Sequence, residues 1–154
     1  MRSASRPVSP TGLRRGENVD WKLELIVVPV ADVDRAKDFY VGRCGFELLV
    51  DHRAGDEFRV VQVIPRGSAC AIALMKNADA AGSLQGLHLV VADIEAGRAE
   101  LVGRGVEVGG LFHFDEGRPV DGPDPGRADY NTFFTFSDPD GNGWLVQEVR
   151  RTAR

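Results

Sequence analysis

An α+β fold made of two tandem βαβββ modules is predicted by three observations. Residues 30–43 align without gaps on residues 91–104, and both segments begin with Val-Ala-Asp and end with Val-Gly-Arg. Each segment follows a run of apolar residues and continues with apolar side chains at helical spacing. Each is then followed by further strand-like segments. The repeated order indicates two copies of one module, whose open faces would curl a mixed sheet around a trough.

The first module opens with the apolar run of residues 23–30, which reads as a buried strand. Asp32 stands where a helix needs an N-cap, and Val33, Ala36 and Tyr40 follow at helical spacing. After the turn at Gly45 come three strand-like segments, "FELLVD", "EFRVVQVIP" and "ACAIALM". These elements complete the first βαβββ unit.

The second module opens with a strand over residues 86–91, and Asp93 is the expected N-cap of its helix. The turn at Gly105 is followed by strand-like "VEVGGLF", "NTFFTF" and "GWLVQEV". Residues 113–130 are rich in Gly, Pro and Asp, so they are predicted to form no regular strand or helix. A lid over a binding site and a simple insertion both fit a loop of this length.

Residues 1–20 are predicted to be a flexible tail, and residues 21–150 a single domain with modules at 21–76 and 86–150. The tail has Arg, Ser and Pro but no apolar stretch typical of a secretory signal. No window approaches the ~20 apolar residues of a membrane span. Cys44 and Cys70 lie outside any metal-binding or disulfide pattern. A cytoplasmic protein that does not bind membranes is expected.

The net charge of −4 understates the acidity of the domain, because seven arginines lie near the two ends of the chain. An acidic body repels phosphate backbones, so no nucleic-acid partner is expected. The acidity would favour a cationic small ligand, although it also fits simple solvation. The excess of arginine over lysine suggests a bacterial gene.

Two stretches resemble the vicinal oxygen chelate superfamily, which includes glyoxalase I, extradiol dioxygenases and bleomycin-resistance proteins. They are "PVADVDRAKDFYVGRCGFELL" at residues 29–49 and "FSDPDGNGWLVQE" at residues 136–148. The resemblance implies paired βαβββ modules around a trough in which enzymes of the family usually hold a divalent metal. It places the usual ligands at Leu25, Gly86, Leu145 and within "ACAIALMK", where His and Glu are missing. No metal site is therefore expected. Binding of a divalent metal stays an open alternative.

The candidate site residues are polar or aromatic side chains of the predicted trough. Strand alternation turns His88 and Gln147 inward, and Gln62 as well if Val61 and Val63 pack under the helix. Glu148 would face away from the trough unless a bulge at residues 141–143 shifts the parity of the strand. The full set of candidate ligand-binding residues is Gln62, His88, His113, Tyr130, Phe134, Trp144 and Gln147.

Two functions fit these features. The first is a metal-free protein similar to bleomycin-resistance proteins, a homodimer that holds an organic ligand such as an antibiotic or another secondary metabolite. The alternative is an enzyme, either a lyase, an isomerase or a dioxygenase. It would use a shifted metal site, or His88 and Glu148 as catalytic acid and base.

Overall fold

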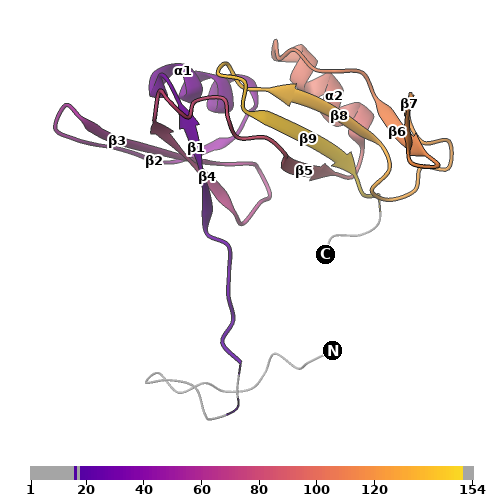
Figure 1. Ribbon diagram of the computed structural model, residues 1–154, viewed down its shortest axis with the longest axis horizontal. Helices are drawn as coiled ribbons and strands as arrows, with labels where there is room; N and C mark the ends of the chain where they lie inside the picture. The colour runs from indigo at the N-terminus through magenta and orange to yellow at the C-terminus, as the bar shows by residue number, and fades with distance from the viewer. Residues whose placement is uncertain (1–15, 17, 151–154) are drawn as a thin grey trace.

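The computed structural model describes residue 16 and residues 18–150 (Figure 1). The first module has the predicted order βαβββ, and the second has one strand more. The first module comprises β1 (Leu25–Val30), α1 (Val33–Lys37), the π-helical turn η1 (Asp38–Arg43), β2 (Glu47–Ala54), β3 (Phe58–Ile64) and β4 (Ala71–Lys76). The second comprises β5 (Leu87–Val91), α2 (Ile94–Gly103), β6 (Phe112–Asp115), β7 (Arg118–Asp121), β8 (Phe133–Ser137) and β9 (Gly143–Glu148).

The strands form two mixed sheets, which confirms the predicted α+β class. The first sheet has the order β1-β4-β3-β2 and the second β5-β9-β8-β6-β7. In each sheet the first strand of the module pairs in parallel with the last, β1 with β4 and β5 with β9. β1 and β5 therefore lie at corresponding edges of the two sheets.

Both helices begin where the sequence predicts. The Asp32 side chain accepts a hydrogen bond from the Arg35 backbone N–H, and Asp93 accepts one from Ala96 in the same way. Each carboxylate thereby satisfies a backbone donor that lacks a partner within the helix. After one α-helical turn the first helix widens into η1, which ends with a hydrogen bond from Cys44 N–H to the Phe39 carbonyl.

The second module contains a hairpin that the sequence analysis did not predict. The expected strand over residues 106–112 is reduced to a single bridge, Val108 with Phe136, followed by β6. β6 and β7 pair across a two-residue turn at Glu116 and Gly117, both with positive φ. Such a turn matches the twist of a hairpin. The prediction that residues 113–130 form no regular strand is therefore wrong for their first half.

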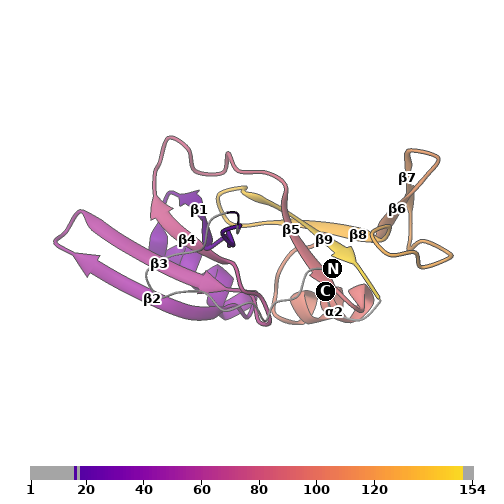
Figure 2. The same ribbon diagram turned by 90° about the horizontal axis from the view of Figure 1, so that it is seen from below.

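A single hydrophobic core joins the two modules, which lie side by side in both views (Figures 1 and 2). Tyr40 and Phe46 of the first module pack against Trp144 of the second, with ring centroids 5.9 Å apart in each pair. Phe39 contacts Phe136 in the same region. The helix of the first module thus contributes to the core of the second.

The segment leading into β1 projects from the domain (Figure 1). Its apolar side chains alternate and are exposed, with Trp21 at 90%. We call residues 18–24 the N-terminal arm. The rest of the predicted tail, apart from Gly16, lies outside the described residues. None of the helices in the described part of the chain is long and apolar enough to cross a membrane.

Candidate functional site

Each sheet buries one face and leaves the other open. In β3, Val61 and Val63 are fully buried, whereas Gln62 between them is partly exposed. Gln62 pairs in register with Ala73 of β4, which in turn pairs with Val27 of β1. Because paired residues share a face, Val27, Ala73 and Gln62 form one row across the open face of the first sheet. Val27 is 52% exposed, so the described residues leave this part of the face uncovered.

The second sheet follows the same pattern. Leu87, Leu89 and Val91 turn toward α2 or the core, whereas His88 and Val90 turn to the open face and are exposed. Val90 pairs with Gln147, and Gln147 pairs with Phe133. These three side chains form a row matching that of the first sheet. Gln62, His88 and Gln147 therefore all lie on open faces, but Gln62 is on a different sheet from the other two.

Glu148 lies on the opposite side of the second sheet from His88 and Gln147. β9 pairs with β8 in unbroken register from Gly143 to Gln147, so no bulge shifts its parity. The Glu148 side chain is fully buried. The hypothesis of a bulge at residues 141–143 that turns Glu148 inward is therefore wrong. The positive φ at Gly141 occurs in the turn before β9, and the strand itself is regular.

The buried Glu148 carboxylate has structural partners. Arg127 donates to both carboxylate oxygens, at 3.1 Å through Nε and 2.8 Å through Nη2. Oε2 also accepts from the Ile94 backbone N–H at the start of α2. The hydrogen bond to Glu148 raises the pKa of Arg127, while burial opposes this rise. Glu148 thus fixes both a loop and a helix terminus, and the geometry does not bring it together with His88 as an acid–base pair.

His88 presents one defined hydrogen-bonding atom. Its Nδ1 lies 2.5 Å from the Gly86 carbonyl oxygen, which can only accept, so Nδ1 carries the proton in that contact. In the neutral ring Nε2 is then an acceptor. His88 borders a groove of about 310 Å³ between the modules, whose wall includes Ile26, Cys70 and Leu87. The groove includes neither Gln62 nor Gln147.

Of the other predicted ligand-binding residues, Trp144 also lines this groove, whereas Phe134, His113 and Tyr130 lie outside it. Phe134 and Trp144 are buried in the core, which corrects their expected place on the ligand side. His113 is also buried, with Nδ1 2.7 Å from the Gly122 carbonyl oxygen. Tyr130 adopts a positive φ of 66°, and its N–H donates to the Glu148 carbonyl. In the described chain His113 and Tyr130 therefore anchor the loop between β7 and β8.

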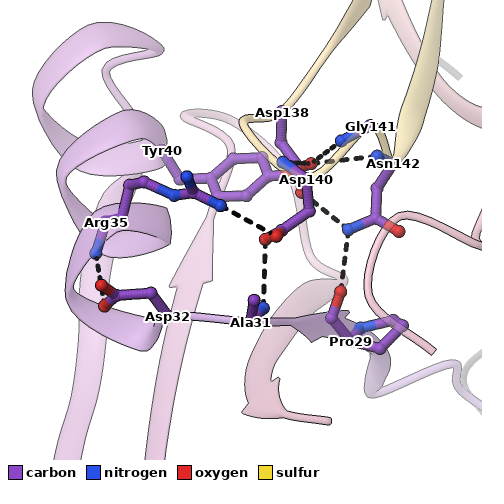
Figure 3. Close-up of polar contacts among 9 residues, drawn as sticks. All are labelled: Pro29, Ala31, Asp32, Arg35, Tyr40, Asp138, Asp140, Gly141 and Asn142. Atoms are coloured by element: carbon purple, nitrogen blue, oxygen red, sulfur yellow. Dashed lines mark hydrogen bonds and ion pairs between the residues drawn. The ribbon is translucent and has the colours of Figure 1, made fainter. Parts of the chain in front are cut away.

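The motif "DPDGNG" forms a polar clamp between the modules (Figure 3). One Asp138 oxygen accepts the backbone N–H groups of Asp140, Gly141 and Asn142. The other oxygen accepts the Tyr40 hydroxyl at 2.9 Å and the Asn142 amide at 2.8 Å. Burial raises the pKa of Tyr40, so its hydroxyl stays protonated as a donor.

The clamp extends to the strand and helix of the first module. Asn142 donates to the Pro29 carbonyl, and Asp140 accepts from Ala31 N–H and from the Arg35 guanidinium at 2.9 Å. The motif that resembles the superfamily therefore serves the junction of the modules.

The second sheet carries an aromatic cluster that the sequence analysis did not predict. Phe112 pairs with Phe133 in register, so both share the open face with Gln147. The ring centroids of Phe112, Phe114 and Phe133 lie 5.4–5.9 Å apart. The side chain of Phe114 is 44% exposed. The alternation Phe-His-Phe at residues 112–114 was the available signal. This alternation was not used, because residues 113–130 were interpreted as a loop.

The described residues do not fit the metal that the resemblance implies. Among residue 16 and residues 18–150, no three His, Cys, Asp or Glu side chains gather where they could hold a metal ion. The open-face positions of β1 and β9 carry Leu25 and Leu145, whose side chains have no donor atoms. His88 alone would not make a site.

Comparison with known proteins defines the class of this fold. Residues 22–146 match the family model described as "Glyoxalase/Bleomycin resistance protein/Dioxygenase superfamily". The chain belongs to this superfamily.

The chain is also similar to individual proteins along most of its length. TnmS3, an antibiotic binding protein from Streptomyces sp. CB03234, is 34% identical, with a TM-score of 0.66 over 86% of this chain and 98% of that one. A glyoxalase/bleomycin resistance protein from the same organism is 36% identical, with a TM-score of 0.63 over 82% of this chain and 100% of that one. The uncharacterized protein YetH of Bacillus subtilis (strain 168) is 29% identical over 80% of this chain and 94% of its own length.

Proposed function

We propose that this protein binds a small organic molecule, an antibiotic or another secondary metabolite, on the open faces of its sheets and without a metal. The observation that carries the proposal is the composition of these faces. Exposed valines alternate in register with hydrogen-bonding side chains: Val27 lies in the row of Gln62, and Val90 in the row of Gln147. Binding sites for organic ligands combine such apolar area with a few polar groups that fix orientation.

Three further features support the proposal. The likeness to TnmS3 extends over nearly the whole domain. The cluster of Phe112, Phe114 and Phe133 offers an aromatic surface beside Gln147, on which an unsaturated ligand can stack. With Nδ1 of His88 directed at the Gly86 carbonyl, Nε2 is the ring atom that can form a hydrogen bond with the ligand.

The ligand site is completed by a second copy of the chain. In the described part of the chain each sheet has an open face with exposed side chains, and Gln62 and Gln147 lie on different sheets. The arm adds Val19, Trp21 and Leu23, all more than half exposed. Exposed apolar groups in such number are typical of surfaces that associate. In a homodimer the open face of one copy would be opposed by the other, enclosing the ligand.

The test is a binding screen with a panel of natural-product antibiotics, followed by thermal denaturation and calorimetry. A true ligand should stabilise the chain saturably, by about 2.7 kcal/mol at a concentration one hundred times its Kd. Gln147→Leu and Gln62→Leu should weaken ligand binding. Each should reduce the binding free energy by about 1–3 kcal/mol, because a polar group of the ligand loses its hydrogen-bond partner. The exposed Glu107→Gln should serve as an unchanged control. If no compound stabilises the protein, or both leucine variants bind normally, the proposed site is wrong.

Metal independence is tested separately. Treatment with a strong chelator should change neither the melting temperature nor ligand affinity, and elemental analysis of the purified protein should find less than one metal ion per chain. A stoichiometric metal whose loss on His88→Ala abolishes ligand binding would contradict this part of the proposal.

A further inference from the structure

A second cavity lies on the other side of the second sheet from the proposed ligand site. It has a volume of about 140 Å³, is partly open to solvent, and is lined by residues of both modules. Leu89, Phe134 and Val146 form its floor, and Leu101 of α2 closes one side. These residues occupy the buried face of the sheet, so β5, β8 and β9 separate the cavity from His88 and Gln147.

The wall contributed by the first module is also apolar. Phe46 is buried, and Cys44 beside it has a thiol whose pKa is raised to about 12 by burial. The thiol therefore stays protonated and acts as a small apolar group. In the described part of the chain, every buried side-chain nitrogen or oxygen has a hydrogen-bond partner. No buried polar side-chain atom in the wall of the cavity therefore needs a ligand or a water molecule as its partner.

Among the described residues that line the cavity, the charged ones are Arg66 and Glu100. Arg66 and Glu100 approach to 3.4 Å and are 63% and 44% exposed, so they face solvent where the cavity opens. An exposed ion pair of this kind contributes at most about 1 kcal/mol, so it opens readily. A neutral molecule could pass this pair, whereas an ion would find no counter-charge beyond it among the lining residues.

From the size, lining and entrance of this cavity we infer that it is a binding site for one small, neutral, apolar molecule with a single ring. An enclosed apolar cavity of about 150 Å³ binds benzene. This cavity has a similar volume and a mostly apolar wall, with a solvent-exposed edge at Arg66 and Glu100. The occupant contacts Phe46 and Cys44 of the first module and Leu101, Phe134 and Val146 of the second. Binding there strengthens the packing between the modules, independently of any ligand on the open faces.

Benzene is the probe, and the full chain is titrated while backbone amides are followed by NMR. The amides of Gly45, Gly97 and Leu101 should shift saturably, whereas those of His88 and Gln147 on the open face should not. The bulky 1,3,5-triisopropylbenzene should cause no shift at the first three amides, because it exceeds the cavity. Benzene shifts confined to the open face, no saturable shift, or equal binding of both compounds would overturn the inference.

A pair of tryptophan variants on α2 locates the site. Leu101→Trp fills the cavity and should weaken benzene binding at least about tenfold, or about 1.4 kcal/mol. Val102→Trp, at a 51% exposed position one residue further on, should bind benzene as the unmodified chain does. Unchanged binding in a folded Leu101→Trp variant would contradict the site, and if that variant does not fold, the comparison of the two hydrocarbons decides. Because its reporters differ from those of the open faces, this experiment can fail without affecting the proposed function.

Discussion

At the level of single residues, the buried carboxylate of Glu148 depends on Arg127 for its charge balance. Arg127→Ala removes both side-chain donors and leaves a fully buried carboxylate with the Ile94 N–H. We expect a loss of about 3–5 kcal/mol in the free energy of unfolding, measured in urea. Glu148→Gln should cost less, because the arginine left behind is 25% exposed and can be hydrated.

Glu95→Gln is the matched control for this pair. Glu95 also contacts Arg127, at 3.3 Å, but its side chain is 59% exposed. Its replacement should change stability by no more than about 1 kcal/mol. Equal losses for Glu95→Gln and Arg127→Ala would show that the burial of Glu148 is not what makes the pair important.

Tyr40 links two buried partners, so its hydroxyl should matter more than its ring contacts suggest. It donates to Asp138 and accepts from Trp144 Nε1, each at 2.9 Å. Tyr40→Phe keeps the ring but orphans the indole donor and one carboxylate contact, which should cost about 1–3 kcal/mol. An unchanged midpoint of chemical denaturation in Tyr40→Phe would argue against the clamp.

Acid sensitivity follows from Asp51. Hydrogen bonds from Arg59 and Lys37 lower the pKa of this carboxyl below its ordinary value of 3.8. Because the folded pKa is the lower one, the stabilisation is present above about pH 4 and is lost as the pH falls through the folded value. Asp51→Asn should flatten the decline of stability between pH 4 and pH 2. Asp56→Asn, in the exposed turn between β2 and β3, should leave the decline intact.

The site residues show what could and could not be inferred from the sequence alone. Strand alternation placed Gln62, His88 and Gln147 on open faces and Glu148 away from them, because β3, β5 and β9 are regular. It did not reveal that Glu148 pairs with Arg127, since that contact depends on how a distant loop folds back. It also could not separate Phe134 and Trp144 of the core from Phe133, because aromatic residues suit both faces of a sheet.

At the level of elements, the β6–β7 hairpin depends on its two-residue turn. Gly117 has a φ of 79°, a region in which a residue with a Cβ is strained by about 1–2 kcal/mol. Gly117→Ala should therefore destabilise the hairpin, measured as faster amide exchange in β6 and β7. Gly103→Ala, at the last residue of α2 and with open space around it, should instead stabilise the chain by up to about 1 kcal/mol. Unchanged amide exchange in β6 and β7 of Gly117→Ala would contradict the assigned turn.

The elements of the first module were predictable and those of the second only in part. Strands β1 to β4 follow short turns, and their apolar runs coincide with the observed ladder. In the second module the run at residues 106–112 lacks a full partner strand, so its β propensity is not realised. β7 contains Pro119, which weakens any strand prediction, and the strand is possible because it lies at the edge of the sheet.

At the level of the whole molecule, association should depend on the N-terminal arm. Trp21→Ser removes the most exposed large apolar side chain of the described residues, and we expect it to shift the proposed dimer toward monomer in sedimentation experiments. Val102→Ser removes an exposed apolar group on α2 and should leave the molecular mass unchanged. A monomeric unmodified protein at micromolar concentration would contradict the dimer, and an unaffected dimer in Trp21→Ser would remove the arm from the interface.

The polar clamp has an evolutionary consequence. Asp138 and Asn142 join the modules through atoms that face neither the open sheets nor the groove at His88. Selection for a stable junction would retain them whatever the protein binds, while positions such as Gln62 and Gln147 are free to diverge between ligands. A search by this motif will therefore gather enzymes and binding proteins alike. Enzymes and binding proteins can be told apart only by comparing the residues on the open faces of the sheets. A substitution there changes ligand specificity with little effect on the stability of the fold.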